Sequence, residues 1–95
     1  MSVIWTRPAA RDLGAIQDYV ARDNPVAAYR LTQTVRQCVR HLTDHPNMGR
    51  QGRVGGTREL VISRTPYIVP YRVRGDQVEI LAVFHGARKW PESFK

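Results

Sequence analysis

The apolar residues of this 95-residue chain change their period once, and that change limits the folds open to it. From residue 9 to about residue 42 they recur every three or four positions, whereas from residue 57 onward they alternate with other residues. The first period is typical of amphipathic helices and the second of strands. The sequence therefore predicts an α+β domain in which two helices pack on one face of an antiparallel sheet.

The first half predicts a short strand followed by a helical hairpin. Residues 2–5 alternate weakly, and Thr6 can cap a helix that has Pro8 in its first turn. Asn24 and Pro25 end this helix and begin a second one, which we expect to run from residue 25 to about residue 44.

The second half predicts a three-stranded antiparallel meander. Its strands cover about residues 57–63, 67–74 and 78–84, and the connections between them are short enough for hairpins. Pro70 lies within the middle strand, where a proline removes a ladder donor, so we expect a bulge or bend there.

Alternation along the strands sorts side chains between the two faces of the sheet. If Tyr67, Val69, Tyr71 and Val73 point toward the helices, Arg72 points to the open face. The same reasoning assigns His85 to the open face. We expect three further cations at the border of that face: Arg50, Arg53 and Arg88.

Basic residues outnumber acidic ones, and the excess lies in the second half. The formal net charge is +7, and residues 46–95 hold nine basic groups against four acids. Thirteen of the 15 basic residues are arginine, whose guanidinium suits carboxylates and phosphates. The composition predicts an acidic partner, either a nucleic acid or an acidic protein.

The length is that of a single domain, which we expect to cover residues 1–95. Cys38 is the only cysteine, so the chain has no internal disulfide, and a reducing, cytoplasmic location is expected. We found no signal peptide and no apolar run of membrane-spanning length. His41 and His45 lack a nearby third ligand, so no metal or other cofactor is predicted.

Four stretches of the chain form a pattern: WTRPAARDLGAIQDYVARDNPVAAYRL, HPNMGRQGRV, TRELVISRTPYIVPYRV and QVEILAVFHGARKWP, covering about residues 3–91. Together they resemble the RelE/ParE superfamily of bacterial toxins, and they are closer to its ParE branch. The resemblance implies the toxin of a type II toxin-antitoxin pair, which arrests growth when its antitoxin is degraded. It also implies a cognate antitoxin partner, whose binding segment we expect to be acidic and partly disordered.

The resemblance leaves two activities open. The ParE branch poisons DNA gyrase and is not thought to catalyse a reaction. The RelE branch cuts mRNA on the ribosome without a metal, which requires proton transfer and cations to stabilise the phosphate. We predict gyrase inhibition, with mRNA cleavage as the alternative. A small nucleic-acid-binding module without toxicity is a third hypothesis.

The candidate site residues divide between these activities. His85 and Arg88 are the catalytic candidates if the protein cleaves mRNA, because imidazole titrates near neutral pH and the resemblance places a functional arginine at Arg88. Arginines that contact a target or nucleic acid are predicted at four positions: Arg50, Arg53, Arg58 and Arg72. Three other positions, where the RelE branch has cations, carry none in this chain: Glu59, Val61 and Ile68.

Overall fold

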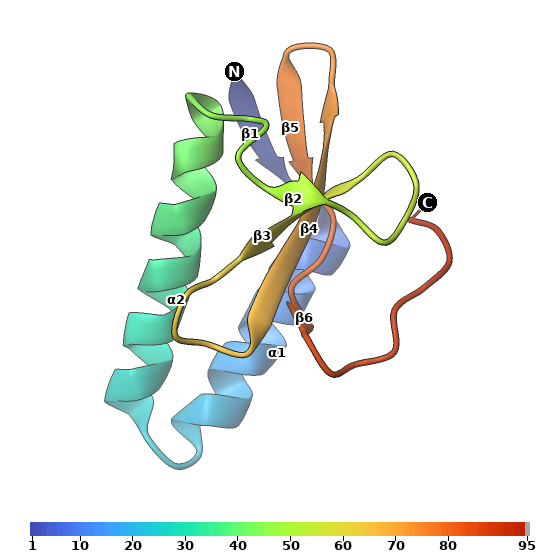
Figure 1. Ribbon diagram of the computed structural model, residues 1–95. Helices are drawn as coiled ribbons and strands as arrows, with labels where there is room; N and C mark the ends of the chain where they lie inside the picture. The colour runs from blue at the N-terminus through green and yellow to red at the C-terminus, as the bar shows by residue number, and fades with distance from the viewer. Residues whose placement is uncertain (95) are drawn as a thin grey trace.

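The computed structural model describes residues 1–94 and shows two helices packed on one face of a mixed sheet, so the α+β prediction is confirmed (Figure 1). The helical elements are α1 (Arg7–Ala21), α2 (Pro25–Arg40) and the 3-10 turn η1 (His41–Thr43). The strands are β1 (Ser2–Trp5), β2 (Arg50–Gln51), β3 (Arg58–Val61), β4 (Tyr67–Arg74), β5 (Gln77–Ile80) and β6 (Phe84–His85).

Short polar side chains begin both long helices at the predicted residues. Thr6 Oγ1 and Asn24 Oδ1 each accept a hydrogen bond from the backbone N–H three residues later, at 3.4 and 3.0 Å. Each cap satisfies a donor that has no partner within the helix, and a proline follows in the first turn. α2 continues into η1, so helical backbone ends at Thr43, close to the predicted residue 44.

The sheet contains the predicted meander and extends it at both edges. β3, β4 and β5 are consecutive antiparallel neighbours in the order β1-β5-β4-β3-β2. β1 lies at one edge and pairs with β5 in parallel, while β2 lies at the other edge and pairs with β3. The N-terminal strand is therefore held by the second half of the chain.

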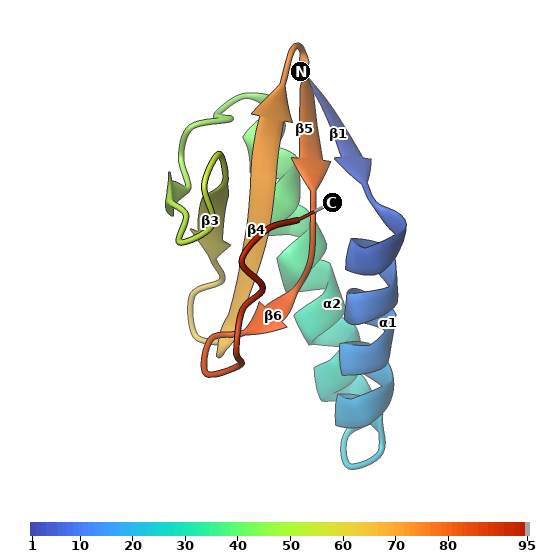
Figure 2. The ribbon, with the colours of Figure 1, turned by 90° about the vertical axis from the view of Figure 1, so that its right-hand side faces the viewer.

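The core lies between the sheet and the two helices. Leu13 of α1 and Val35 and Val39 of α2 are buried against Val69 and Tyr71 of β4. Cys38 is partly buried and packs beside this cluster. Figure 2 shows α2 behind the strands, α1 beside them, and the C-terminal segment crossing in front of β4.

Pro70 interrupts the pairing on one side of β4, which confirms the predicted bulge. Tyr71 pairs with Ile80, but Ile68 pairs with Phe84, so the strand opposite β4 carries one extra residue between these pairs. The Pro70 carbonyl accepts a hydrogen bond from the Leu81 N–H. Because the N–H and C=O of one strand residue point to the same side, an N–H at this position would also have pointed toward the segment that contains Leu81, but proline has none. The third predicted strand is consequently split into β5 and β6.

The extra residue reverses the faces of the residues that follow it, so the predicted position of His85 was wrong. A bulge of one residue exchanges inward and outward positions along a strand. His85 pairs with Tyr67 and lies on the helix side, whereas Phe84 pairs with Ile68 and lies on the other face. Arg72 pairs with Glu79, which comes before the extra residue in the chain, so Arg72 points to the open face as predicted.

Tyr71 fixes the corner between η1 and β2 to the middle of the sheet. Its hydroxyl donates to the Pro46 carbonyl at 2.7 Å and accepts from Gly49 N–H at 2.9 Å. The tyrosine side chain is fully buried, and a Cβ on Gly49 would lie 2.6 Å from its ring. Only glycine allows this close approach of the backbone.

We predict that Tyr71→Phe destabilises the protein by about 1–3 kcal/mol, because it leaves a partly buried carbonyl and a buried N–H without their hydrogen-bond partner. Urea unfolding followed by circular dichroism measures this loss. Tyr29→Phe is the matched control, since Tyr29 is exposed on α2. Equal unfolding midpoints for the two variants would show that the corner does not depend on the hydroxyl.

Candidate functional site

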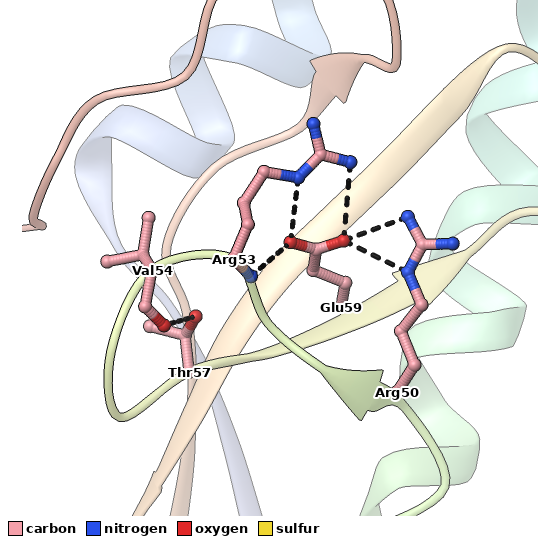
Figure 3. Close-up of polar contacts among 5 residues, drawn as sticks. All are labelled: Arg50, Arg53, Val54, Thr57 and Glu59. Carbon is pink, nitrogen blue, oxygen red and sulfur yellow. Dashed lines mark hydrogen bonds and ion pairs between the residues drawn. The ribbon is translucent and has the colours of Figure 1, made fainter.

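A buried carboxylate gathers two arginines on the open face of the sheet (Figure 3). Arg50 Nη2 lies 2.9 Å from Glu59 Oε1, and Arg53 Nε lies 3.1 Å from Oε2. The Arg53 backbone N–H also donates to Oε2, at 2.9 Å. The glutamate side chain is 2% exposed, while those of Arg50 and Arg53 are 54% and 42% exposed. The carboxylate is thus covered by groups whose outer surfaces reach solvent.

This arrangement keeps Glu59 ionised. Burial by itself raises the pKa of the carboxyl, but the Arg53 backbone N–H and the two guanidinium groups stabilise the charged form and hold the pKa below its ordinary value. The carboxylate in turn fixes the loop after β2. A second tie within this loop is the hydrogen bond from the Thr57 hydroxyl to the Val54 carbonyl, at 2.7 Å.

Arg53 also joins this cluster to the C-terminal segment. Its guanidinium carbon lies 3.8 Å from the centroid of the Trp90 ring, within the range of a cation–π contact. Trp90 meets the Phe84 ring edge-on at 5.1 Å, and Phe94 stacks on the same ring at 6.0 Å. The segment after β6 therefore covers part of the face that the sequence predicted to be open.

The other two predicted target-binding arginines are also held within the chain. Arg72 Nε lies 2.6 Å from Glu79 Oε1, and this contact lowers the pKa of that carboxyl. Arg58 Nη1 donates to the Gly49 carbonyl at 2.8 Å. Because Arg58 pairs with Tyr71, which faces the core, its side chain leaves the sheet on the side opposite to Arg72. The four arginines do not converge on one point.

A groove of about 540 Å³ lies on the open face, between residues 54–57, the end of β4 and residues 92–94. A second hollow of about 440 Å³ shares residues 55–57, Arg72 and Val73 with it and reaches Arg58. We call the first of these the open-face groove. Its charged lining residues are Arg72, Arg74 and Glu92.

The two catalytic candidates share a different cavity, on the side of α1. His85 and Arg88 line a hollow of about 280 Å³ with Asp12, Tyr19 and Tyr67. The His85 ring meets the Tyr67 ring edge-on at 5.9 Å, and His85 Nδ1 accepts from the Ala87 N–H at 3.1 Å. The guanidinium of Arg88 lies 4.2 Å from the Phe84 ring centroid. His85 and Arg88 therefore share a cavity on the helix side, while Arg88 also contacts Phe84, which lies on the open face.

Sequence reasoning missed the carboxylates that organise these arginines. Glu59 and Glu79 read as ordinary alternating strand residues, yet each holds a pair of arginines. Charge was the signal that could have revealed these pairs, because each glutamate lies on a strand beside or opposite a position that carries arginine.

Among residues 1–94, no three histidine, cysteine or acidic side chains are grouped as a metal site would require. No described helix is long and apolar enough to cross a bilayer.

Residues 3–90 match the model of the family described as the ParE toxin of the type II toxin-antitoxin system, parDE. The chain belongs to the ParE toxin family. Its resemblance to the RelE/ParE superfamily is thereby confirmed, and it is the toxin of a type II toxin-antitoxin system.

Individual relatives agree with this assignment. Y4kP of Sinorhizobium fredii, named for an expected role as a toxin, is 44% identical over 88 residues, which cover 93% of this chain and 91% of the relative. Toxin RelE2 of Caulobacter vibrioides is 36% identical to this chain over 86 residues, which cover 90% of this chain and 96% of the relative. A solved chain of the chromosomal ParDE system of P. aeruginosa is 38% identical, with a TM-score of 0.80 over 90% of this chain and 95% of that one.

We predict that Glu59→Gln in this ParE family toxin lowers the free energy of unfolding by about 1–2 kcal/mol at pH 7, because the amide loses the charge-assisted bonds to two half-exposed arginines. The measurement is chemical unfolding at several pH values, with Glu92→Gln in the exposed tail as the control.

The pH dependence of this difference has a defined sign. Since the folded-state pKa of Glu59 lies below the unfolded-state value of about 4.3, the carboxylate contributes fully above that pH. The contribution disappears as the pH falls from there through the folded-state pKa. Wild type and Glu59→Gln should therefore converge in acid. A difference in stability that stays constant from neutral pH down to acid would rule out the ionised carboxylate as its source.

Proposed function

We propose that this toxin arrests bacterial growth by binding DNA gyrase and inhibiting it, without catalysing a reaction. The observation that carries the proposal is that the arginines of the open face are ion-paired with glutamates of the same chain. Arg50 and Arg53 are bound to Glu59, and Arg72 is bound to Glu79. Guanidinium groups held in this way are suited to a fixed recognition surface, whereas stabilising a transition-state phosphate needs cations that converge on one point.

The three positions without cations support the same proposal. Glu59 places a negative charge on this face, Val61 is exposed and Ile68 is buried beside Phe84. None of these side chains can neutralise a phosphate. Membership of the ParE family is consistent with a target other than mRNA.

We further propose that an antitoxin holds this protein inactive. The P. aeruginosa structure is of a ParDE toxin-antitoxin system, and the present chain is similar to one of its chains over nearly its full length. The net charge of +7 favours a partner with an acidic binding segment.

One observation favours mRNA cleavage as a second candidate function. His85 and Arg88 line the same cavity as Tyr67, which brings a titratable imidazole, a phenol and a guanidinium together. In this alternative the imidazole accepts the proton of the RNA 2'-hydroxyl as its oxygen bonds to the adjacent phosphorus. The P–O5' bond breaks, the 5'-oxygen leaves and takes a proton from solvent, and the guanidinium stabilises the charge on the phosphate. One relative, from Caulobacter vibrioides, carries the name toxin RelE2.

Pulse labelling in cells separates the two candidates. We predict that inducing the toxin without an antitoxin stops incorporation of labelled thymidine within minutes, before incorporation of labelled leucine falls. His85→Ala and Arg88→Ala should both remain toxic, because neither side chain pairs with Glu59 or Glu79, which hold the arginines of the proposed recognition surface. Arg11→Ala, an exposed position on α1, is the control substitution.

The opposite order of events would favour the second candidate. If leucine incorporation falls first and both substitutions abolish toxicity, the cavity of His85 and Arg88 is a catalytic site. If neither incorporation falls, the toxin does not act on DNA or protein synthesis, and gyrase inhibition is excluded.

A further inference from the structure

The side of α2 that points away from the core carries a row of basic and polar side chains. Residues three or four apart lie on the same side of a helix, and one such set runs along this side. Its exposed members are Val26, Tyr29, Arg30, Gln33, Arg36, Gln37 and Arg40, which we call the α2 outer face. In Figure 1, α2 lies along one side of the molecule, with no other described helix or strand beyond it.

α2 contains no acidic residue. Its 16 residues include three arginines and neither aspartate nor glutamate, which gives the helix a charge of +3. In α1, by contrast, Arg7 and Arg11 are balanced by Asp12 and Asp18, so the charge of that helix is zero. The excess positive charge of the two helices therefore lies on α2.

The arginines of α2 differ from those of the open face in having no carboxylate. The open-face arginines are ion-paired with Glu59 or Glu79, whereas Arg30, Arg36 and Arg40 form no ion pair within residues 1–94. Guanidinium groups without an internal carboxylate keep their charge for an external anion. The α2 outer face is thus the surface on which the chain's positive charge is least compensated.

The stability of the helix does not account for the whole row. Arg36 and Arg40 stand one turn apart, and two like charges at that spacing weaken a helix. The helix dipole favours Arg40 in the last turn, but Arg30 lies in the first half, where a cation gains nothing from it. The guanidinium carbon of Arg36 lies 5.7 Å from the centroid of the Trp5 ring, a contact that neutralises none of its charge.

We infer that the α2 outer face binds the phosphate backbone of duplex DNA. From Arg30 to Arg40 the row covers about 15 Å along the helix axis. Duplex DNA carries one charge for about every 1.7 Å of its axis, so over this length each guanidinium has a phosphate to meet. Between the arginines stand Gln33, Gln37 and, at the N-terminal end, Tyr29, whose side chains donate the hydrogen bonds that proteins make to phosphate and sugar oxygens.

The composition of this face favours a nucleic acid over a protein partner. A protein interface is built around a central cluster of apolar or aromatic side chains, but here Val26 and Tyr29 lie at one end and the centre is arginine and glutamine. Single-stranded nucleic acid would need several aromatic rings for its bases to stack on, and this face has one. We name DNA rather than RNA because the inference rests on the proposed function, in which the target, gyrase, acts on duplex DNA.

This surface is separate from the one proposed to recognise gyrase. α2 packs on the helix side of the sheet, and in Figure 2 it lies behind the strands. The cluster of Arg50, Arg53 and Glu59 lies on the open face. The toxin can therefore contact a protein through one face and DNA through the other. Contacts to phosphates position a protein without reading the base sequence, so this binding is independent of sequence.

The salt dependence of DNA binding tests this inference on the purified full-length protein. The probe is a fluorescein-labelled duplex of about 20 base pairs, and fluorescence anisotropy gives its Kd between about 50 and about 200 mM salt. Three phosphate contacts predict that the Kd of the wild type rises about fortyfold over this range. Arg30→Gln/Arg40→Gln removes two of the three contacts, so its Kd should rise only about threefold to fourfold.

Arg64→Gln/Lys89→Gln is the matched control, because both residues are exposed and lie in the segments after β3 and β6. It removes the same charge and should keep the wild-type salt dependence. Since Arg30 and Arg40 form no ion pair within residues 1–94, the α2 double variant should keep the wild-type melting temperature. Equal weakening of DNA binding by both double variants would show that net charge alone drives binding, and would overturn the inference.

Two further probes identify a different occupant of this face. They are an RNA duplex of the same sequence and a peptide of about ten glutamates, each labelled with fluorescein. The inference predicts that DNA binds at least as tightly as the RNA duplex and more tightly than the peptide. Tighter binding of either probe, lost in Arg30→Gln/Arg40→Gln, would assign the face to RNA or to an acidic protein, and DNA would be the wrong partner.

Inhibition of gyrase separates the inference from the function on which it rests. If the wild type binds the duplex through α2 but does not inhibit supercoiling, the proposed function fails and the DNA contact stands on its own measurement. If the wild type inhibits supercoiling and Arg30→Gln/Arg40→Gln binds the duplex as tightly as the wild type, the proposed function stands and the inference is wrong. Weaker DNA binding and a severalfold higher inhibitory concentration in this variant, both unchanged in Arg64→Gln/Lys89→Gln, support both.

Discussion

The missing N–H of Pro70 is the constraint on which the arrangement of the second half depends. Since this residue cannot donate to the neighbouring strand, one extra residue enters between the pairs Tyr71–Ile80 and Ile68–Phe84. Phe84 then lies on the face away from the helices, where Trp90 and Phe94 pack on it. The bulge thus determines that the C-terminal segment covers the sheet.

The same bulge separates two groups of functional candidates. His85 is turned toward α1, while Arg72 and the cluster around Glu59 remain on the other face. On that face, buried or partly buried carboxylates hold the arginines in fixed orientations. Such a surface loses little conformational entropy when it binds a partner, which favours recognition by shape and charge. This arrangement supports the proposal that the ParE family toxin acts by binding a target.

Much of this fold follows from the sequence by local rules. The capping residues Thr6 and Asn24, the helical hairpin and the core position of Tyr71 were all predictable, because caps and periodicity act over a few residues. The face occupied by His85 was not, since counting alternate residues assumes an uninterrupted strand. The pairs of Glu59 with Arg50 and Arg53 escaped prediction because they depend on which strands become neighbours. The candidate site was therefore predicted as a set of arginines but not as an arrangement.

The central claim is that the protein inhibits gyrase by binding it, with the His85 and Arg88 cavity playing no catalytic part. The most direct measurement is supercoiling of a relaxed plasmid by purified gyrase and ATP, titrated with the purified toxin. Inhibition by the wild type, retained in a His85→Ala/Arg88→Ala double variant and reversed by the antitoxin, is the predicted result. Full supercoiling in the presence of excess toxin, together with cleavage of mRNA on purified ribosomes that the double variant no longer performs, would contradict it.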